Sequence, residues 1–170
     1  MRDKSLIVRY YENMMKTCFV GHRQIQANIR DRLKKAVINL IENGCRKFTM
    51  GTHGEFDRMA LGVCKELRNV YTDIEIEVVI TSLNSIKKQL VYNDNFGKEY
   101  EIPFADVDTV IYDIENIYFK QQIIFSNKKM IDDCNTLICY VDNKKKRSGA
   151  KIALNYAKRK GLKIINLFED

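Results

Sequence analysis

The sequence lacks the features that mark secreted, zinc-binding and membrane proteins. Its five cysteines are odd in number, lie mostly inside apolar runs and include no CxxC pair, so neither a disulfide framework nor a zinc site is expected. No stretch reaches the roughly 18 apolar residues that span a bilayer, and the N-terminus has no continuous apolar core of the signal-peptide type. We therefore expect buried reduced thiols, no metal, no membrane segment and a cytoplasmic location.

The common short motifs of nucleotide and metal enzymes are absent as well. There is no G-x-x-x-x-G-K-[ST], which argues against a magnesium-dependent P-loop NTPase. There is no G-x-G-x-x-G, which argues against an ordinary dinucleotide dehydrogenase, and no H-E-x-x-H. No cofactor is expected from these patterns.

Length and charge set the next limits. A chain of 170 residues with 45% hydrophobic residues predicts a single compact domain with a sizeable core. The 29 Lys and Arg residues against 22 Asp and Glu residues give a net charge of +7, which favours anionic partners, including nucleotides and nucleic acids. Charge alone does not choose between these partners.

Short apolar runs alternate with segments that have helical periodicity. The predicted strands are residues 16–21, 46–51, 74–80, 108–113, 135–142 and 162–168. The predicted helices are residues 25–41, 55–69, 116–134 and 148–161, with Gly44 and Gly161 as stop signals. Such alternation predicts an α/β fold with a mostly parallel sheet that is covered by helices on both faces.

Two regions depart from this alternation. Residues 83–107 contain the only proline, Pro103, and are interpreted as a long excursion over the ligand site. Residues 1–15 are interpreted as an N-terminal extension that forms an added helix.

The chemistry is concentrated where strands meet helices. Gly21-His22-Arg23 follows the first strand, the loop 51–57 (GTHGEFD) follows the second, and the loop 141–151 follows the fifth. Each junction opens a helix, whose free N–H groups and positive dipole attract anions, and glycine lets a phosphate approach the main chain. The only two histidines of the chain fall in these loops. The sequence therefore predicts one anion site at the carboxyl ends of the strands.

Structural alternatives stay open for the individual residues. His22 could cap a helix while Arg23 pairs with a carboxylate, although a guanidinium also suits phosphate. Asp57 could complement a helix start or accept from ribose hydroxyls. The basic run 144–147 is either a solvated charge run or a mobile flap over phosphates, and Asp132 is either a ligand contact or a cap before the fifth strand.

Three segments together resemble a known superfamily. They are TCFVGHRQI (17–25), GTHGEFDRMA (51–60) and the stretch from Asn127 to Leu167 that contains IDDC and RSGAKIALNYA. In this order they are similar to the SLOG superfamily, and most similar to its small YpsA-like bacterial and phage proteins. The resemblance implies a single-domain, Rossmann-like three-layer sandwich whose motifs line one nucleotide-type pocket.

The resemblance, carried over by matching position, implies a set of ligand-binding residues. They are Gly21, His22, Arg23, Gly51, Gly54, Asp57, Asp132, Ser148, Gly149 and Ala150. The position of the same loops in the chain adds Thr52, His53 and Arg147. The chain departs from the family pattern at Thr52-His53, where glycine or alanine is usual, and at Ala150, where a threonine is usual.

Three functions remain from this reading. The favoured one is a binding protein that senses or sequesters a nucleotide or nucleotide-derived ligand. The alternative is a nucleoside-monophosphate N-glycosidase of the LOG type, but RSGAKIALNYA lacks the glutamate of that loop, and Glu55 is only a weak candidate for a catalytic base. A DprA-like nucleic-acid binder is less favoured, and a homo-oligomer is expected in any of these cases.

Overall fold

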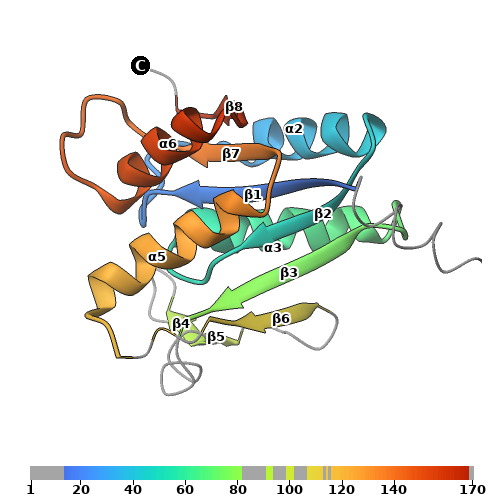
Figure 1. Ribbon diagram of the computed structural model, residues 1–170. Helices are drawn as coiled ribbons and strands as arrows, with labels where there is room; N and C mark the ends of the chain where they lie inside the picture. Colours follow the sequence, from blue (N-terminus) through green and yellow to red (C-terminus); the bar gives the residue numbers. More distant parts are fainter. Residues whose placement is uncertain are drawn as a thin grey trace, which may run out of the picture.

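The computed structural model describes residues 14–81, 91–93, 99–101, 107–112, 114 and 116–168, and the account below refers to these. Strands and helices alternate along them as the sequence predicts (Figure 1). The strands are β1 (Met15–Gly21), β2 (Cys45–Met50), β3 (Glu75–Ile80), β4 (Val91–Asn93), β5 (Glu99–Glu101), β6 (Asp108–Ile111), β7 (Thr136–Tyr140) and β8 (Lys163–Asn166). The helices are α2 (Arg30–Glu42), α3 (Glu55–Arg68), α5 (Phe119–Asp132) and α6 (Gly149–Lys160).

The main sheet has six strands in the order β6-β3-β2-β1-β7-β8, and all its described pairings are parallel. β4 and β5 form a separate antiparallel pair. From β1 the chain builds outward through β2, β3 and β6, and then returns to add β7 and β8 on the other side of β1. The order therefore reverses between β1 and β7, which is where ligands bind in open α/β sheets.

Helices cover both faces of this sheet (Figure 1). α2 and α3 pack on one face and α5 and α6 on the other, so the strands separate two hydrophobic clusters. β1 shows the alternation most clearly, because Phe19 belongs to the α2 and α3 side whereas Cys18 and Val20 belong to the α5 and α6 side. This is the predicted three-layer, Rossmann-like α/β sandwich.

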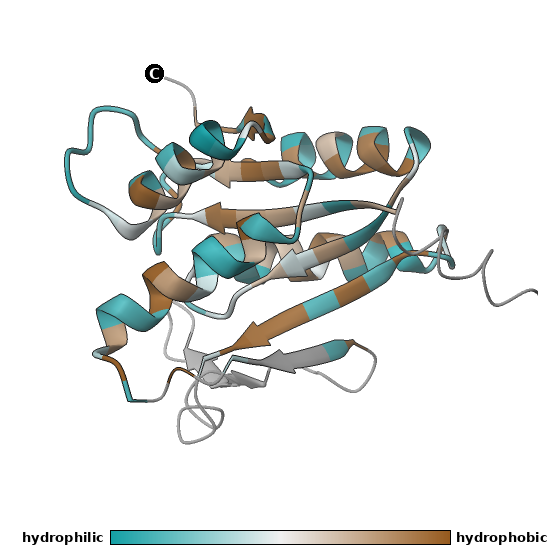
Figure 2. Cartoon of the chain, in the orientation of Figure 1, coloured by the Kyte–Doolittle hydropathy of each residue, from teal (hydrophilic) through white to brown (hydrophobic). Residues whose placement is uncertain are grey.

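Each helix carries both polar and apolar residues, as the colours in Figure 2 show. In α2 the buried residues are Leu33, Val37, Leu40 and Ile41, a spacing of three or four that gives one apolar stripe. The apolar pattern that starts at Ile25 is not all helical, because residues 25–29 form a loop and α2 begins at Arg30. The predicted stop signals hold, since Gly44 has φ 94° and Gly161 has φ 77°, values that favour glycine.

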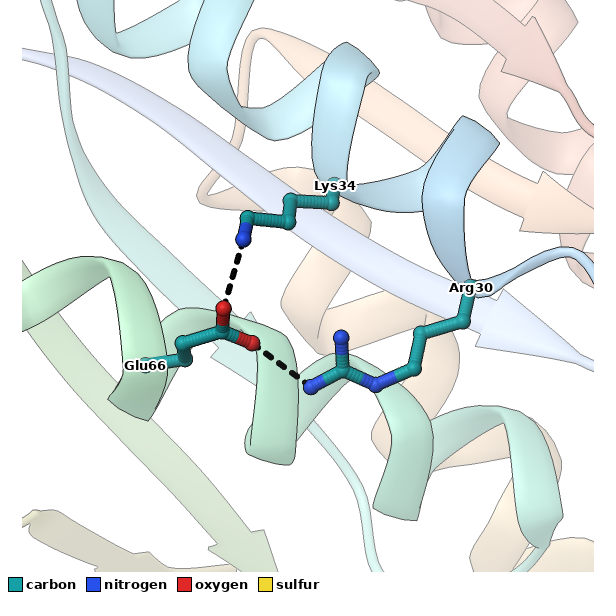
Figure 3. Close-up of polar contacts among 3 residues, drawn as sticks. All are labelled: Arg30, Lys34 and Glu66. Carbon is teal, nitrogen blue, oxygen red and sulfur yellow. Dashed lines mark hydrogen bonds and ion pairs between the residues drawn. The ribbon is translucent and has the colours of Figure 1, made fainter.

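An ion-pair network joins α2 to α3 on the surface (Figure 3). Both Arg30 and Lys34 donate to the carboxylate of Glu66, and the Arg30 contact is 2.7 Å long. These two cations lower the pKa of Glu66 to about 2. Arg30 and Lys34 are one helical turn apart, so a single carboxylate on the neighbouring helix reaches both.

Some expectations concern residues outside the described ranges. The predicted added helix falls mainly on residues 1–13, and much of the excursion predicted for 83–107 falls on 82–90, 94–98 and 102–106. Within the described residues, no helix combines the length and apolar character needed to cross a bilayer. The expectation of buried cysteines holds for Cys18, Cys45, Cys64 and Cys139, whereas Cys134 is half-buried.

Candidate functional site

The end of β1 is packed tightly against the start of α3. A Cβ atom added to Gly21 would lie 2.5 Å from Cγ of Phe56, a distance that side chains do not tolerate. Gly21 has no positive φ, so its backbone conformation does not require a glycine. The strand ends on Gly21 because Phe56, which is fully buried, occupies the space of a side chain.

The loops that follow β1 and β2 are bonded to each other. The N–H of Glu55 donates to the carbonyl oxygen of Arg23 at 2.9 Å, and the Glu55 carboxylate accepts from the N–H of Ile25 at 2.8 Å. A Cβ atom on Gly54 would lie 2.8 Å from the Cα atom of Arg23. The two loops therefore form one unit, and Glu55 serves to hold the backbone of the first loop.

His22 connects the first loop to the one after β7. Its backbone N–H donates to the carbonyl of Tyr140 at 3.1 Å, and its ring Nε2 accepts from the N–H of Asp142 at 2.9 Å. Burial and the nearby Lys145 lower the pKa of His22, against an opposing effect of Asp142. An imidazole whose Nε2 accepts carries its proton on Nδ1, so His22 is a neutral ring with an Nδ1–H donor.

His53 and Asp57 are two further titratable residues, and they lie close together after β2. The carboxylate Oδ2 of Asp57 accepts from the backbone N–H of His53 at 3.0 Å. Burial raises the pKa of Asp57 to about 6, despite that hydrogen bond and the charge of Arg58. Burial, with a smaller effect of the Arg23 charge, lowers the pKa of His53 to about 4, so this ring is neutral at pH 7.

The first turn of α6 supplies backbone donors. Ser148 caps the helix, because its hydroxyl accepts from the N–H of Lys151 at 3.1 Å. The N–H groups of Gly149 and Ala150 have no acceptor among the described residues. These two donors and the positive end of the helix dipole give this turn a positive local potential.

These groups border one cavity of about 590 Å³. It lies at the carboxyl ends of β1 and β2 and between α5 and α6. The lining residues are Val20, Gly21, His22, Arg23, His53, Gly54, Asp57, Lys120, Ile123, Ile124, Asn127, Lys146, Arg147, Ser148, Gly149, Ala150 and Ile152. In this wall four basic side chains face a single carboxylate, so an anionic ligand is favoured electrostatically.

Most of the residues predicted from the sequence lie on this wall. The exceptions are Gly51, Thr52 and Asp132, which do not line the cavity. Asp132 lies in the last turn of α5, where its carboxylate accepts from Tyr156 and pairs with Lys160 at 2.8 Å. Asp132 therefore links the C-terminal parts of α5 and α6.

The weak catalytic candidate, Glu55, does not line the cavity either. The alternative in which Arg23 pairs with a carboxylate is not seen in the described part of the chain, where its guanidinium lies 5.9 Å from the centre of the Phe119 ring. No group of three or more His, Cys, Asp and Glu side chains in the described ranges is placed to hold a metal ion.

α5 contributes a side of the cavity that was not predicted from the sequence. Lys120, Ile123, Ile124 and Asn127 recur at three or four residues and line the cavity from one side of this helix. The predicted topology could have indicated this contribution of α5. A crossover helix between parallel strands begins at the edge of the sheet where the preceding strand ends. The first turns of α5 therefore had to reach the same rim as the three loops.

Comparisons with solved structures show the same fold. DNA processing protein A (DprA) from Streptococcus pneumoniae matches with a TM-score of 0.56 and 18% sequence identity, over 91% of this chain and 50% of that one. DNA processing protein A from Helicobacter pylori, whose structure concerns its single-stranded DNA binding mode, matches with a TM-score of 0.55 and 14% identity, over 95% of this chain and 67% of that one. This chain thus spans half the length of the Streptococcus protein.

No curated protein sequence matches the chain. The model of the YpsA family, described as the YspA SLOG family, matches residues 6–167, which is nearly the whole sequence and includes all three strand-end motifs. The chain belongs to this YpsA-type SLOG family, as its motifs predict.

Proposed function

We propose that this protein binds a nucleotide or a nucleotide-derived ligand in the cavity at the ends of β1, β2 and β7. The observation that carries the proposal is the start of α6, where the N–H groups of Gly149 and Ala150 have no acceptor among the described residues and both residues line a cavity together with Arg23 and Arg147. Helix N-termini and arginine forks are the usual partners of phosphate.

The remaining wall suits the neutral part of such a ligand. Ile123 and Ile124 of α5 and Ile152 of α6 give the cavity an apolar side. A volume of about 590 Å³ lies within the range of small-molecule sites and accommodates a mononucleotide. A phosphate at one end and a base or sugar against isoleucines would use both kinds of surface.

The proposed role is binding without hydrolysis, as a sensor or sequestering module. The N-glycosidase alternative needs a carboxylate placed to activate water or the sugar, and Glu55 is bonded to the N–H of Ile25 at 2.8 Å. Asp57 is the one carboxylate on the described wall. Release of free base from a nucleoside monophosphate, abolished by Asp57→Asn, would support the enzyme alternative instead.

Calorimetric titration with the four ribonucleoside 5′-monophosphates tests the proposal. At least one should bind with a stoichiometry of one per chain. Arg147→Ala and Arg23→Ala should each weaken it by roughly tenfold or more, because a hydrogen bond to a charged group contributes about 1.5–3 kcal/mol. The effect should shrink at high salt. Absence of saturable binding to any of the four would contradict the proposal.

A second candidate is single-stranded nucleic acid, and one observation favours it. Tyr118, Phe119 and Phe125 on or beside α5 are 85%, 49% and 53% exposed, and the Phe119 ring lies 5.9 Å from the guanidinium of Arg23 in the cavity wall. Aromatic rings next to cations are the usual platform for unstacked bases. The structural similarity to a DprA protein studied for its single-stranded DNA binding adds to this candidate.

Fluorescence anisotropy with a labelled oligothymidylate distinguishes the two candidates. If nucleic acid is the ligand, Tyr118→Ala combined with Phe125→Ala should weaken the oligonucleotide by at least tenfold, since stacking contributes about 1–3 kcal/mol per base. Neither side chain lines the cavity, so mononucleotide binding should be unchanged. The expected homo-oligomer is tested on the same samples by light scattering.

A further inference from the structure

His53 carries a buried polar atom with no partner. Its Nε2 is shielded from solvent and makes no hydrogen bond within the described ranges. The side chain belongs to the wall of the cavity. Because buried polar atoms are nearly always paired in native proteins, an unpaired one in a cavity wall indicates a position that a ligand group fills.

Asp57 offers a second acceptor beside His53. Its Oδ2 accepts a hydrogen bond from the backbone N–H of His53 at 3.0 Å. His53 lies in the loop between β2 and α3, Asp57 lies in the first turn of α3, and both line the same cavity. Together they present a carboxylate, which only accepts, and an imidazole nitrogen to the ligand.

The distance between this pair and the phosphate position fits a pentose phosphate. β1 lies between β2 and β7 in the sheet, so the loops after β2 and β7 are two strand spacings apart, about 10 Å. A 5-phosphorylated pentose, with a hydrogen bond of about 3 Å at each end, spans a gap of this order. The phosphate would lie at Gly149 and the sugar hydroxyls at His53 and Asp57.

We propose that His53 Nε2 and Asp57 Oδ1 bind the neighbouring hydroxyls of a ribose, so that the site selects ribose over 2-deoxyribose. The proposal rests on the function proposed above and names its ligand class. A hydroxyl donates to the carboxylate and serves as donor or acceptor toward the imidazole, so a vicinal pair satisfies both atoms. A phosphate, whose oxygens only accept, would satisfy the imidazole but not the carboxylate.

Phe119 takes part in this site as a cover. Its ring packs edge to face against His53, with the ring centroids 5.6 Å apart, and the side chain is 49% exposed. Rotation of this half-exposed ring toward solvent gives a ligand hydroxyl access to Nε2.

Ribose 5-phosphate and 2-deoxyribose 5-phosphate are the probes for a test, with inorganic phosphate as a third. These sugars carry no base, so base recognition does not affect the comparison. In calorimetric titrations the wild type should bind ribose 5-phosphate at least tenfold more tightly than the 2-deoxy sugar. His53→Phe, which keeps a ring but no nitrogen, should bring the ratio close to one, and His53→Gln should restore part of it. Melting curves establish that each variant is folded.

The outcomes separate the inference from the function on which it rests. If both sugars bind equally to the wild type and lose affinity in Gly149→Asp, the phosphate site stands and ribose selection is wrong. A preference that survives in His53→Phe also overturns the assignment to His53. If neither sugar phosphate nor inorganic phosphate binds, both the proposed function and the inference fail.

Discussion

The ring Nε2 of His22 accepts a hydrogen bond from the backbone N–H of Asp142 at 2.9 Å, and this contact ties the loop after β1 to the loop after β7. β1 and β7 are the neighbours between which the strand order reverses. The imidazole therefore holds together the two sides of the cavity at its base. It also fixes the proton of His22 on Nδ1.

Replacement of His22 should show this role. His22→Phe leaves the Asp142 N–H without an acceptor, which should cost about 1–3 kcal/mol of unfolding free energy, whereas His22→Gln keeps an acceptor and should lose less. The pKa of His22 is lowered in the folded state, so acid favours the unfolded chain. The contribution of neutral His22 to the free energy of unfolding is complete above the ordinary pKa of 6.5. It is lost as the pH falls through the lower pKa of the folded state. Urea unfolding at pH 7.5 and 5 should show a larger acid loss for the wild type than for His22→Gln.

Gly54 should be intolerant of any side chain. Gly54→Ala places a Cβ atom 2.8 Å from the Cα of Arg23, a backbone atom that cannot move aside cheaply, so the variant should lose about 1–3 kcal/mol of stability. Gly62 is the matched control, because it lies inside α3 with nothing within 4 Å of an added Cβ. Gly62→Ala should gain about 0.5–1 kcal/mol through helix propensity. Equal melting temperatures for the two variants would refute the close approach of the loops.

The Asp57 carboxylate should lower the stability of the fold at high pH while it contributes to ligand binding. Its pKa is raised from 3.8 to about 6, so the folded state binds the proton more tightly than the unfolded state. Its stabilising effect is therefore complete below pH 3.8 and is lost as pH rises through about 6. Asp57→Asn removes the buried charge, and at pH 8 it should unfold at a higher temperature, with a gain of about 1–2 kcal/mol that disappears near pH 4. The same variant should bind ribose 5-phosphate more weakly than the wild type. A variant that is less stable than the wild type at pH 8 would contradict this view of Asp57.

Gly149 should be sensitive to charge rather than to size. An added Cβ meets only Cγ2 of Ile123 at 3.9 Å, so Gly149→Ala should bind nucleotide nearly as well as the wild type. Gly149→Asp places a negative charge beside the proposed phosphate and should lower affinity by at least ~100-fold, while the helix start tolerates the carboxylate. Calorimetry on the two variants, with melting curves for each, measures the difference. Equal affinity of both would show that the ligand does not use this helix start.

The fold could be predicted because the spacing of apolar residues and the glycines that end helices indicate the same elements along this sequence. Continuous apolar runs such as the one in β7, whose residues are all buried, indicate central parallel strands. Gly44 and Gly161 mark helix ends because the chain adopts a positive φ there, which favours glycine and makes the end recognisable in the sequence. The start of α2 was less predictable, because Ile25 and Ile29 continue the apolar spacing while the chain between them forms a loop bonded to Glu55.

The site could be predicted in part, since strand-end loops must meet at one edge of a parallel sheet. What the sequence does not state is which partner each residue takes. Gly21 and Gly54 were interpreted as glycines for phosphate approach, but Phe56 and the Arg23 backbone occupy their free side. The lone candidate base, Glu55, is engaged in a loop hydrogen bond. Such contacts between distant segments depend on packing that one-dimensional patterns do not contain.

The position of the bound anion is the measurement that tests the central claim most directly. Uniformly ¹⁵N-labelled protein should be titrated with a ribonucleoside 5′-monophosphate while its amide resonances are recorded. The account predicts saturable shifts that are largest for Gly149 and Ala150 and for His22 and Arg23, which line the cavity. Shifts that gather instead around Tyr156, where Lys128, Arg159 and Lys160 form a separate basic cluster on α5 and α6, would contradict it.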